Sequence, residues 1–213
     1  SAELVHVSFG RMQFPEGKMS TRKGDIVLLD EVIKEAIIRT EKIISEKSRE
    51  LSPEEQKRTA EAMAISAIKY NILSQNREIN MTFDWDRMLS LDGNSGPYLQ
   101  YAYARAKSIL RKAQEQKVSP TPLAIEDKQI SIFNLEEEKS DEVSGTTRES
   151  KNQPPFGYPT EQALLRLLAR FPERVEQAIV QYRPHVISNY LFELAQAFSS
   201  FYNEVSVLNA ATP

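Results

Sequence analysis

The sequence contains no cysteine and only two histidines, His6 and His185, among 213 residues. Disulfides and thiolate metal sites are therefore excluded, and histidines so far apart give no local spacing for metal ligands. The P-loop pattern GxxxxGK[ST] and the dinucleotide-binding pattern GxGxxG are also absent. No apolar run approaches the ~20 residues that cross a bilayer, and the start SAELVHVSFG does not resemble a signal peptide. We therefore expect no metal site and no membrane partner, and a cytoplasmic protein.

Charge is balanced over most of the chain. The formal net charge is −3, and residues 117–158 contain five Lys and Arg against eight Asp and Glu, so the rest sums to zero. Binding to a polyanion depends on a local basic patch and not on such a total. Net charge thus argues neither for nor against nucleic acid as a ligand.

Helical periodicity dominates the sequence. Within residues 26–47, apolar side chains recur on one helical face, and Asp30 is a possible N-cap of this helix. Ser52-Pro53-Glu54-Glu55 is a strong start of a second helix. Further helix starts are predicted near Pro97, Thr160, Pro172 and Pro184. The expected fold is therefore mostly α, with helices packed as a bundle.

The two ends and one internal segment differ from this helical pattern. Residues 3–9, ELVHVSF, alternate as a half-buried strand would, and such a strand needs partners. The end VLNAATP directly follows a predicted helix, so we expect both ends to be cuts in a larger protein. Residues 117–158 combine scattered prolines with acidic and polar runs, which predicts a disordered insertion.

Residues 17–25, GKMSTRKGD, form a compact cationic loop between glycines. Glycines allow backbone N–H groups to approach an anion, and Lys18, Arg22 and Lys23 add positive charge where phosphate charge would accumulate. A solvated basic turn explains the same residues, and charged turns are common. The residue types alone leave both interpretations open.

The loop resembles the KMSKS signature of class I aminoacyl-tRNA synthetases, with Thr21 in place of the second lysine. The chain as a whole resembles arginyl-tRNA synthetases in four further stretches: HVSFG, AIKYNILSQNR, FDWDRMLSLDGNSGPYLQYAYAR and YLFELAQAFSSFYNE. This resemblance implies three parts. Residues 1–28 would be a β/loop remnant of a Rossmann-like catalytic domain, 29–95 a connecting helical segment, and 96–213 a truncated DALR-type anticodon-binding helical domain that contains the insertion 117–158.

In that family, ATP activates arginine, and the arginyl group passes to the 3′-terminal adenosine of tRNA(Arg). The resemblance implies that Lys18 stabilises charge on the departing pyrophosphate, that Arg22 or Lys23 replaces the missing lysine, and that Met19 and Ser20 shape the loop. It also implies Mg²⁺ in the complete enzyme, with no protein ligands for it in this chain, and a monomer. The family's HIGH motif has no match here, so we expect the chain to be inactive alone.

A second candidate site lies on the helix after Pro97. Tyr98, Tyr101 and Arg105 fall on one helical face, and rings beside a guanidinium suit unstacked RNA bases and their phosphates. The same spacing fits amphipathic core tyrosines with hydroxyls at the surface. The resemblance implies anticodon contacts at Tyr101, Arg105 and Tyr202, with Ser206 where eukaryotic members have tryptophan.

Two other function classes remain open at this stage. A freestanding helical RNA-binding module would also bind tRNA, but it would have no use for the strand and loop at residues 3–24. A helical protein-interaction scaffold would have no affinity for tRNA and would be indifferent to salt.

Overall fold

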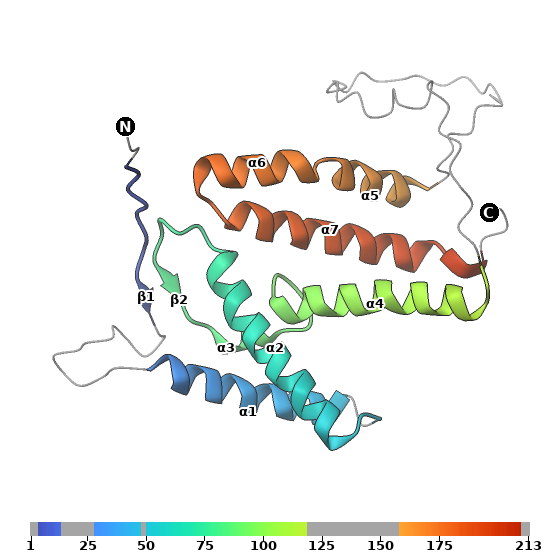
Figure 1. The fold of residues 1–213 in the computed structure, drawn as a ribbon, viewed down its shortest axis with the longest axis horizontal. Helices are drawn as coiled ribbons and strands as arrows, with labels where there is room; N and C mark the ends of the chain where they lie inside the picture. Colours follow the sequence, from blue (N-terminus) through green and yellow to red (C-terminus); the bar gives the residue numbers. More distant parts are fainter. Residues whose placement is uncertain (1–3, 14–27, 48–49, 119–157, 210–213) are drawn as a thin grey trace, which may run out of the picture.

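A computed structural model of the protein describes residues 4–13, 28–47, 50–118 and 158–209. Two groups of helices, α1–α3 and α4–α7, lie side by side, with a small parallel sheet next to the first group (Figure 1). The elements are β1 (Met12–Gln13), α1 (Leu29–Lys47), α2 (Pro53–Leu73), β2 (Met81–Thr82), α3 (Trp85–Leu89), α4 (Gly96–Glu115), α5 (Pro159–Ala169), α6 (Phe171–Gln181), α7 (His185–Glu204) and the 3₁₀ turn η2 (Val207–Asn209). The prediction of a mostly helical fold with a short β segment near its start is confirmed.

The main hydrophobic core lies between α1, α2 and α3. Its buried side chains come from all three helices and from the segment before α3: Val32, Ala36, Ala64, Ala67, Ile68, Phe83, Met88 and Leu89. The small residues of α2 let α1 approach closely, and the buried Thr40 hydroxyl donates to the Ala60 carbonyl oxygen at 2.9 Å. A polar group inside this core is therefore paired, as buried polar groups must be.

The start of α2 confirms the predicted cap. The Ser52 hydroxyl accepts from the Glu55 N–H at 3.4 Å, and the Glu55 carboxylate accepts from the Ser52 N–H at 3.0 Å. This reciprocal capping box satisfies two N–H groups that have no partner inside the helix. Hydrogen bonds from the Ser52 side chain and backbone lower the pKa of the Glu55 carboxyl.

The predicted cap of α1 is wrong by two residues. The helix begins at Leu29, so Asp30 lies in its first turn, and Glu31 instead accepts a hydrogen bond from the Leu28 N–H at 3.2 Å. Both carboxylates still lie where the helix dipole favours negative charge.

The prediction of a strand over residues 3–9 is also wrong for the described part of that range. Residues 4–9 have no regular structure, and Leu4 and Phe9 are 95% and 85% exposed. Pairing begins at Gly10, whose N–H donates to the Arg77 carbonyl oxygen, and continues with Met12 beside Met81 in a parallel register. A period-two pattern marks a chain that could pair, but a strand forms only where a neighbour supplies hydrogen bonds.

The first turn of α4 lies directly against α2. Ser95 caps the helix by accepting from the Tyr98 N–H at 3.2 Å, and Pro97 occupies the first turn as predicted. A Cβ at Gly96 would overlap the Ser66 carbonyl oxygen of α2, so only glycine fits there. This contact determines where α4 begins and in which direction it leaves α2.

The helices α5 and α6 both lie along α7, which in turn lies along α4 (Figure 1). The predicted helix starts near Thr160, Pro172 and Pro184 are confirmed, and the last of these helices, α7, has 20 residues. Tyr182 ends α6 in the left-handed conformation, with φ 52° and ψ 41°. Residues 119–157, nearly all of the predicted insertion, lie outside the described residues.

None of the helices within the described ranges is both long and apolar enough to span a lipid bilayer.

Tyr70 connects the two helix groups. Its side chain is 8% exposed, and its hydroxyl lies 2.9 Å from the Ser188 carbonyl oxygen in α7 and 2.5 Å from the Asn94 side-chain oxygen. The hydroxyl has one proton, so it donates to one of these oxygens at a time. Burial raises the pKa of Tyr70 to about 12.

We expect Tyr70→Phe to lower the free energy of unfolding of the chain by about 1–2 kcal/mol, because the buried Ser188 carbonyl loses a donor. Urea unfolding measures the change. The matched control is Tyr103→Phe, at a tyrosine 64% exposed, which should change stability by less than about 0.5 kcal/mol.

The pH dependence supplies a second check of the same prediction. Because folding raises the pKa of Tyr70 from 10.0 to about 12, the folded state keeps a proton that the unfolded state loses in this interval. The contribution of Tyr70 is complete below pH 10 and declines as the pH rises toward 12, so the gap between wild type and Tyr70→Phe should narrow there. A gap that stays constant with pH would contradict the assignment.

Candidate nucleic-acid interface

Arg105 and Tyr101 form a contact on the surface of α4. The residues are one helical turn apart, and an Nη2 proton of Arg105 is donated to the Tyr101 hydroxyl at 2.6 Å. The guanidinium carbon lies 4.6 Å from the centroid of the Tyr101 ring. The prediction that these two side chains share a face is therefore confirmed.

Tyr202 reaches the same guanidinium from α7. The Arg105 carbon lies 4.7 Å from the centroid of the Tyr202 ring, nearly the same distance as from Tyr101. Residues almost 100 positions apart thus form one unit, which we call the Tyr101–Arg105–Tyr202 cluster. A guanidinium that contacts two rings is restricted in its rotamers before any ligand arrives.

The cluster is open to solvent. Tyr101 is 52% exposed and Tyr202 38%, while Arg105 is half-buried. Within the described part of the chain, the Tyr101 hydroxyl is the one acceptor that we find for the Arg105 guanidinium, which has five N–H donors. The cluster therefore presents ring faces for stacking together with donors for phosphate or base edges.

Tyr98 differs from the other predicted RNA-contacting residues. Its ring lies 5.7 Å from the Phe192 ring in an edge-on arrangement, and its hydroxyl is 3.4 Å from the Ser199 hydroxyl. The structure thus places Tyr98 in the packing between α4 and α7, beside the cluster and not in it. A contact between Tyr98 and RNA stays a prediction.

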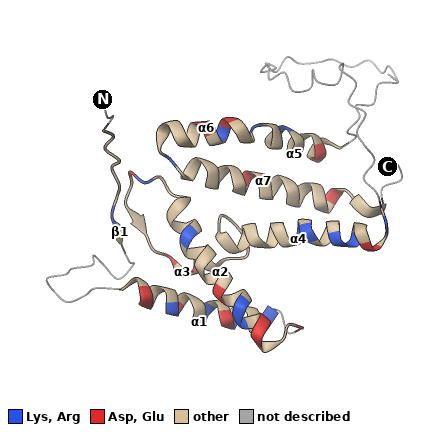
Figure 2. Cartoon of the chain, viewed as in Figure 1, with Lys and Arg blue, Asp and Glu red and all other residues tan. Residues whose placement is uncertain are grey.

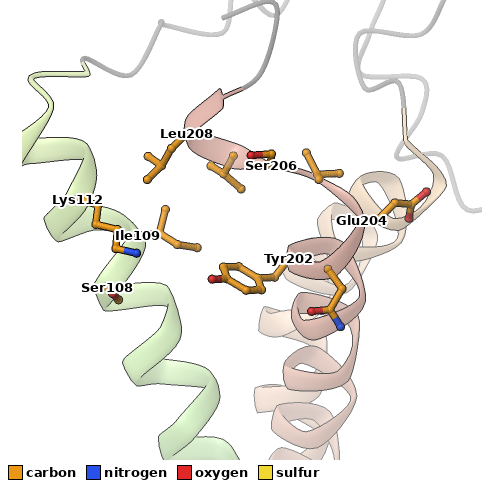
Figure 3. A pocket seen from close by; sticks show the side chains of 10 residues that line it. Ser108, Ile109, Lys112, Tyr202, Glu204, Ser206 and Leu208 are labelled. Atoms are coloured by element: carbon orange, nitrogen blue, oxygen red, sulfur yellow. The ribbon is translucent and has the colours of Figure 1, made fainter. Parts of the chain in front are cut away.

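A cavity of about 340 Å³ adjoins the cluster on the side where α7 ends and η2 follows. Its walls come from the second half of α4 and from the end of α7 through η2, as Figure 3 shows: Ser108, Ile109, Lys112, Tyr202, Asn203, Glu204, Val205, Ser206, Val207 and Leu208. The Tyr202 ring thus belongs both to the cluster and to this cavity. Helical spacing along α4 could have indicated Ser108 and Lys112, which follow Arg105 by three and seven residues. Of the lining residues after α7, the family resemblance had singled out Ser206, and the others gave no signal in the sequence.

Basic residues occur along the second half of α4 (Figure 2). Lys107, Arg111 and Lys112 are all exposed, and the Lys107 ammonium lies 5.6 Å from the centroid of the Tyr103 ring. Arg111 pairs with Glu115 at 3.9 Å, but both side chains are about two-thirds exposed, so this pair contributes little to stability. Successive residues of a helix are about 100° apart, so Lys112 lies on the same face of α4 as Arg105, whereas Lys107 and Arg111 lie on the other side of the helix. Lys112 is therefore the cation placed to add positive charge for a polyanionic ligand beside the cluster.

The cationic loop cannot be compared with this geometry. Its predicted functional residues, Lys18, Met19, Ser20, Arg22 and Lys23, lie outside the described residues. Across the ranges that are described, no group of three or more His, Asp or Glu side chains could hold a metal ion.

Comparisons with known proteins agree on both halves of the chain. A family model described as "DALR anticodon binding domain" matches residues 99–213, and one described as "tRNA synthetases class I (R), catalytic domain" matches residues 1–85. The first match contains the whole Tyr101–Arg105–Tyr202 cluster, and the second contains the loop at residues 17–25.

Curated relatives carry the name arginine–tRNA ligase. The protein from Chloroflexus aurantiacus is 39% identical over 212 residues, which is 99% of this chain and 32% of the relative. The protein from Clostridium perfringens is 38% identical over 205 residues, 96% of this chain and 31% of the relative. The chain thus spans about a third of the length of these relatives.

Solved structures show the same similarity. The arginyl-tRNA synthetase of Thermus thermophilus superposes with a TM-score of 0.67 and 29% identity, over 98% of this chain and 29% of that one. The Plasmodium falciparum enzyme, at 24% identity and a TM-score of 0.64, shares the fold. The DALR anticodon binding domain model covers more than half of the residues, so the chain belongs to that family. In this chain the domain is preceded by a segment that matches the class I tRNA synthetase catalytic domain.

Proposed function

We propose that this chain is part of an arginine–tRNA ligase, which activates arginine with ATP and transfers it to tRNA(Arg). The proposal rests on the relatives' names, on the two family matches and on one feature of the structure. That feature is the Arg105 guanidinium, held on the surface between tyrosine rings from two helices. It provides stacking and charge together, as recognition of single-stranded RNA requires.

In this proposal the cluster binds the anticodon loop. Unstacked bases stack on the exposed faces of Tyr101 and Tyr202, and Arg105 donates to phosphate or to a base edge. The exposed Lys112, on the same face of α4 as Arg105, adds a contact to the phosphate backbone that fixes orientation but does not read sequence. Tyr98 supports the surface by packing α4 on α7.

The loop at residues 17–25 supplies the second role. Lys18, with Arg22 or Lys23, stabilises the negative charge that moves onto pyrophosphate when arginyl-adenylate forms, and Met19 and Ser20 shape the loop. No proton transfer is needed from these residues. The chain has no HIGH motif, so it does not complete adenylation by itself.

The partners follow from the reaction. ATP and arginine are substrates, and Mg²⁺ would neutralise phosphate charge when bound in the complete enzyme. The described residues offer no cluster of ligands for this ion. We propose a cytoplasmic monomer as the working form.

The alternative function is a freestanding, non-catalytic tRNA-binding module. It predicts the same cluster but gives no role to the loop. Two observations favour the enzyme: the catalytic-domain model matches residues 1–85, and residues 10–13 pair with the segment that leads into α3. A pure binding module would need neither.

The loop distinguishes the two proposals. In the complete enzyme, Lys18→Ala should lower the rate of ATP–pyrophosphate exchange by about 100-fold, because one electrostatic contact to the transition state is lost. Affinity for tRNA should not change. An exchange rate equal to wild type would favour the binding module.

The cluster has its own test. Tyr101→Ala should weaken use of tRNA(Arg) in a charging assay on the complete enzyme, by about 1–3 kcal/mol in kcat/KM, because a stacking surface is removed. The matched control is Tyr103→Ala, on the same helix and more exposed, at 64%. Equal losses from both variants would mean that the assay reports general damage to α4 and not loss of the cluster.

Base reading and phosphate contact can be separated with this chain alone. We expect it to prefer tRNA(Arg) over the same tRNA with an altered anticodon, and this preference should persist at moderate salt because base contacts do not release counterions. Filter binding over a salt series measures both quantities. Affinities that are equal and fall steeply with salt would leave only phosphate contacts, and the cluster would not read the anticodon.

A further inference from the structure

Arg77 joins the beginning of the chain to the corner between α6 and α7. Its Nε donates to the Tyr182 carbonyl oxygen at 3.0 Å, and its Nη1 donates to the Ser8 carbonyl oxygen at 2.5 Å. Glu78 accepts from Arg183 at 3.3 Å and lies 3.5 Å from Arg77. We call this set of five residues the Arg77 junction.

The bonds of the junction are directional. Both main acceptors of Arg77 are backbone carbonyls, and its planar guanidinium offers separated donors in a fixed geometry. The Arg77 side chain is 20% exposed, so these charge-assisted bonds are partly shielded from water. The Arg77 carbonyl also accepts from the Gly10 N–H, which ties the same residue to the chain just before β1.

The corner that Arg77 holds is the start of α7. Tyr182 has an unusual left-handed conformation for a residue with a side chain, and α7 begins three residues later. This helix of 20 residues extends about 30 Å. Tyr202, near its other end, contacts Arg105. One continuous helix therefore runs from the Arg77 junction to the Tyr101–Arg105–Tyr202 cluster.

We propose that Arg77 is a positioning residue, through which binding of RNA at the cluster sets the placement of residues 8–13 for the reaction. The proposal rests on the proposed function. Arg77 does not touch RNA itself. It holds α7 and the chain before β1 in one arrangement, so that a shift of Tyr202 on binding RNA is passed along α7 to residues 8–13. Removing it should separate tRNA binding from turnover.

The first measurement is charging of tRNA(Arg) by the complete enzyme. Arg77→Ala should lower kcat by about fivefold or more, the range of typical coupling between sites, while KM for tRNA changes by less than about twofold. The matched control is Arg39→Ala, because the contacts of Arg39 in the described structure, with Glu35 and Trp85, lie within the first helix group. An equal loss of kcat from the control, or a rise in KM that accounts for the whole effect of Arg77→Ala, would overturn the inference.

The second measurement is a double-mutant cycle. If Arg77 transmits the effect of the cluster, Arg77→Ala combined with Arg105→Ala should be little worse in kcat than the more damaging single variant. If the two losses multiply, the residues act independently and the inference is wrong. If Arg105→Ala has no effect on tRNA use, it is the proposed function of the cluster that fails.

Folding is checked separately, because Arg77 also contributes to structure. Thermal melting of each variant shows whether it is folded at the assay temperature. Should Arg77→Ala be unfolded, Arg77→Lys takes its place in both measurements, since lysine keeps the charge but not the separated Nε and Nη1 donors. A kcat equal to wild type in folded Arg77→Lys would show that the fixed geometry is not needed and would overturn the inference.

Discussion

The close contact between the first turn of α4 and the middle of α2 determines much of the remaining structure. Gly96 lies so near the Ser66 carbonyl oxygen that a side chain would not fit, and Ser95 and Pro97 are buried beside it. The start and direction of α4 are thereby set by α2. Because α7 packs along α4, its register on α4 in turn decides that Tyr202, and not a neighbouring side chain, meets Arg105. The candidate site is thus a consequence of backbone packing several turns away.

This origin explains how an exposed cluster can be ordered. A cation–π contact at an exposed site contributes only about 0.5–1 kcal/mol, too little to order two helices. The packing of α4 on α7 holds Tyr101 and Tyr202 at the correct separation, and Arg105 then occupies the space between them. RNA that binds there meets side chains already in place, so less conformational entropy is lost on binding. The cavity beside Tyr202 extends this prepared surface toward η2.

Sequence alone predicted the features that depend on near neighbours. The Ser52 cap, Pro97 in the first turn of α4 and the shared face of Tyr101 and Arg105 all follow from spacings of a few residues. The approach of Tyr202 depends on tertiary packing, so only the family resemblance indicated it. The short helix α3 was missed, because no helix start was predicted between Ser52 and Pro97. Asp84 caps this helical turn by accepting from two N–H groups. The prediction of a strand was wrong for residues 4–9, because an alternating pattern contains no information about a neighbouring strand that could pair with it.

The boundary between the two matched families is not a boundary in the packing. In the described structure, α5 and α6 contain no fully buried residue, and the buried part of α4 is mostly the turn that rests on α2. Tyr70 and Arg77, both within the catalytic-domain match, bond to backbone atoms of α7 and of the α6–α7 corner. Of the two helices that carry the cluster, α4 therefore depends on α2 for much of its burial, whereas α7 packs mainly on α5 and α6 and meets α2 at fewer places. A ligand that binds between α4 and α7 acts on a body that includes α2, and so on the segment that pairs with residues 10–13.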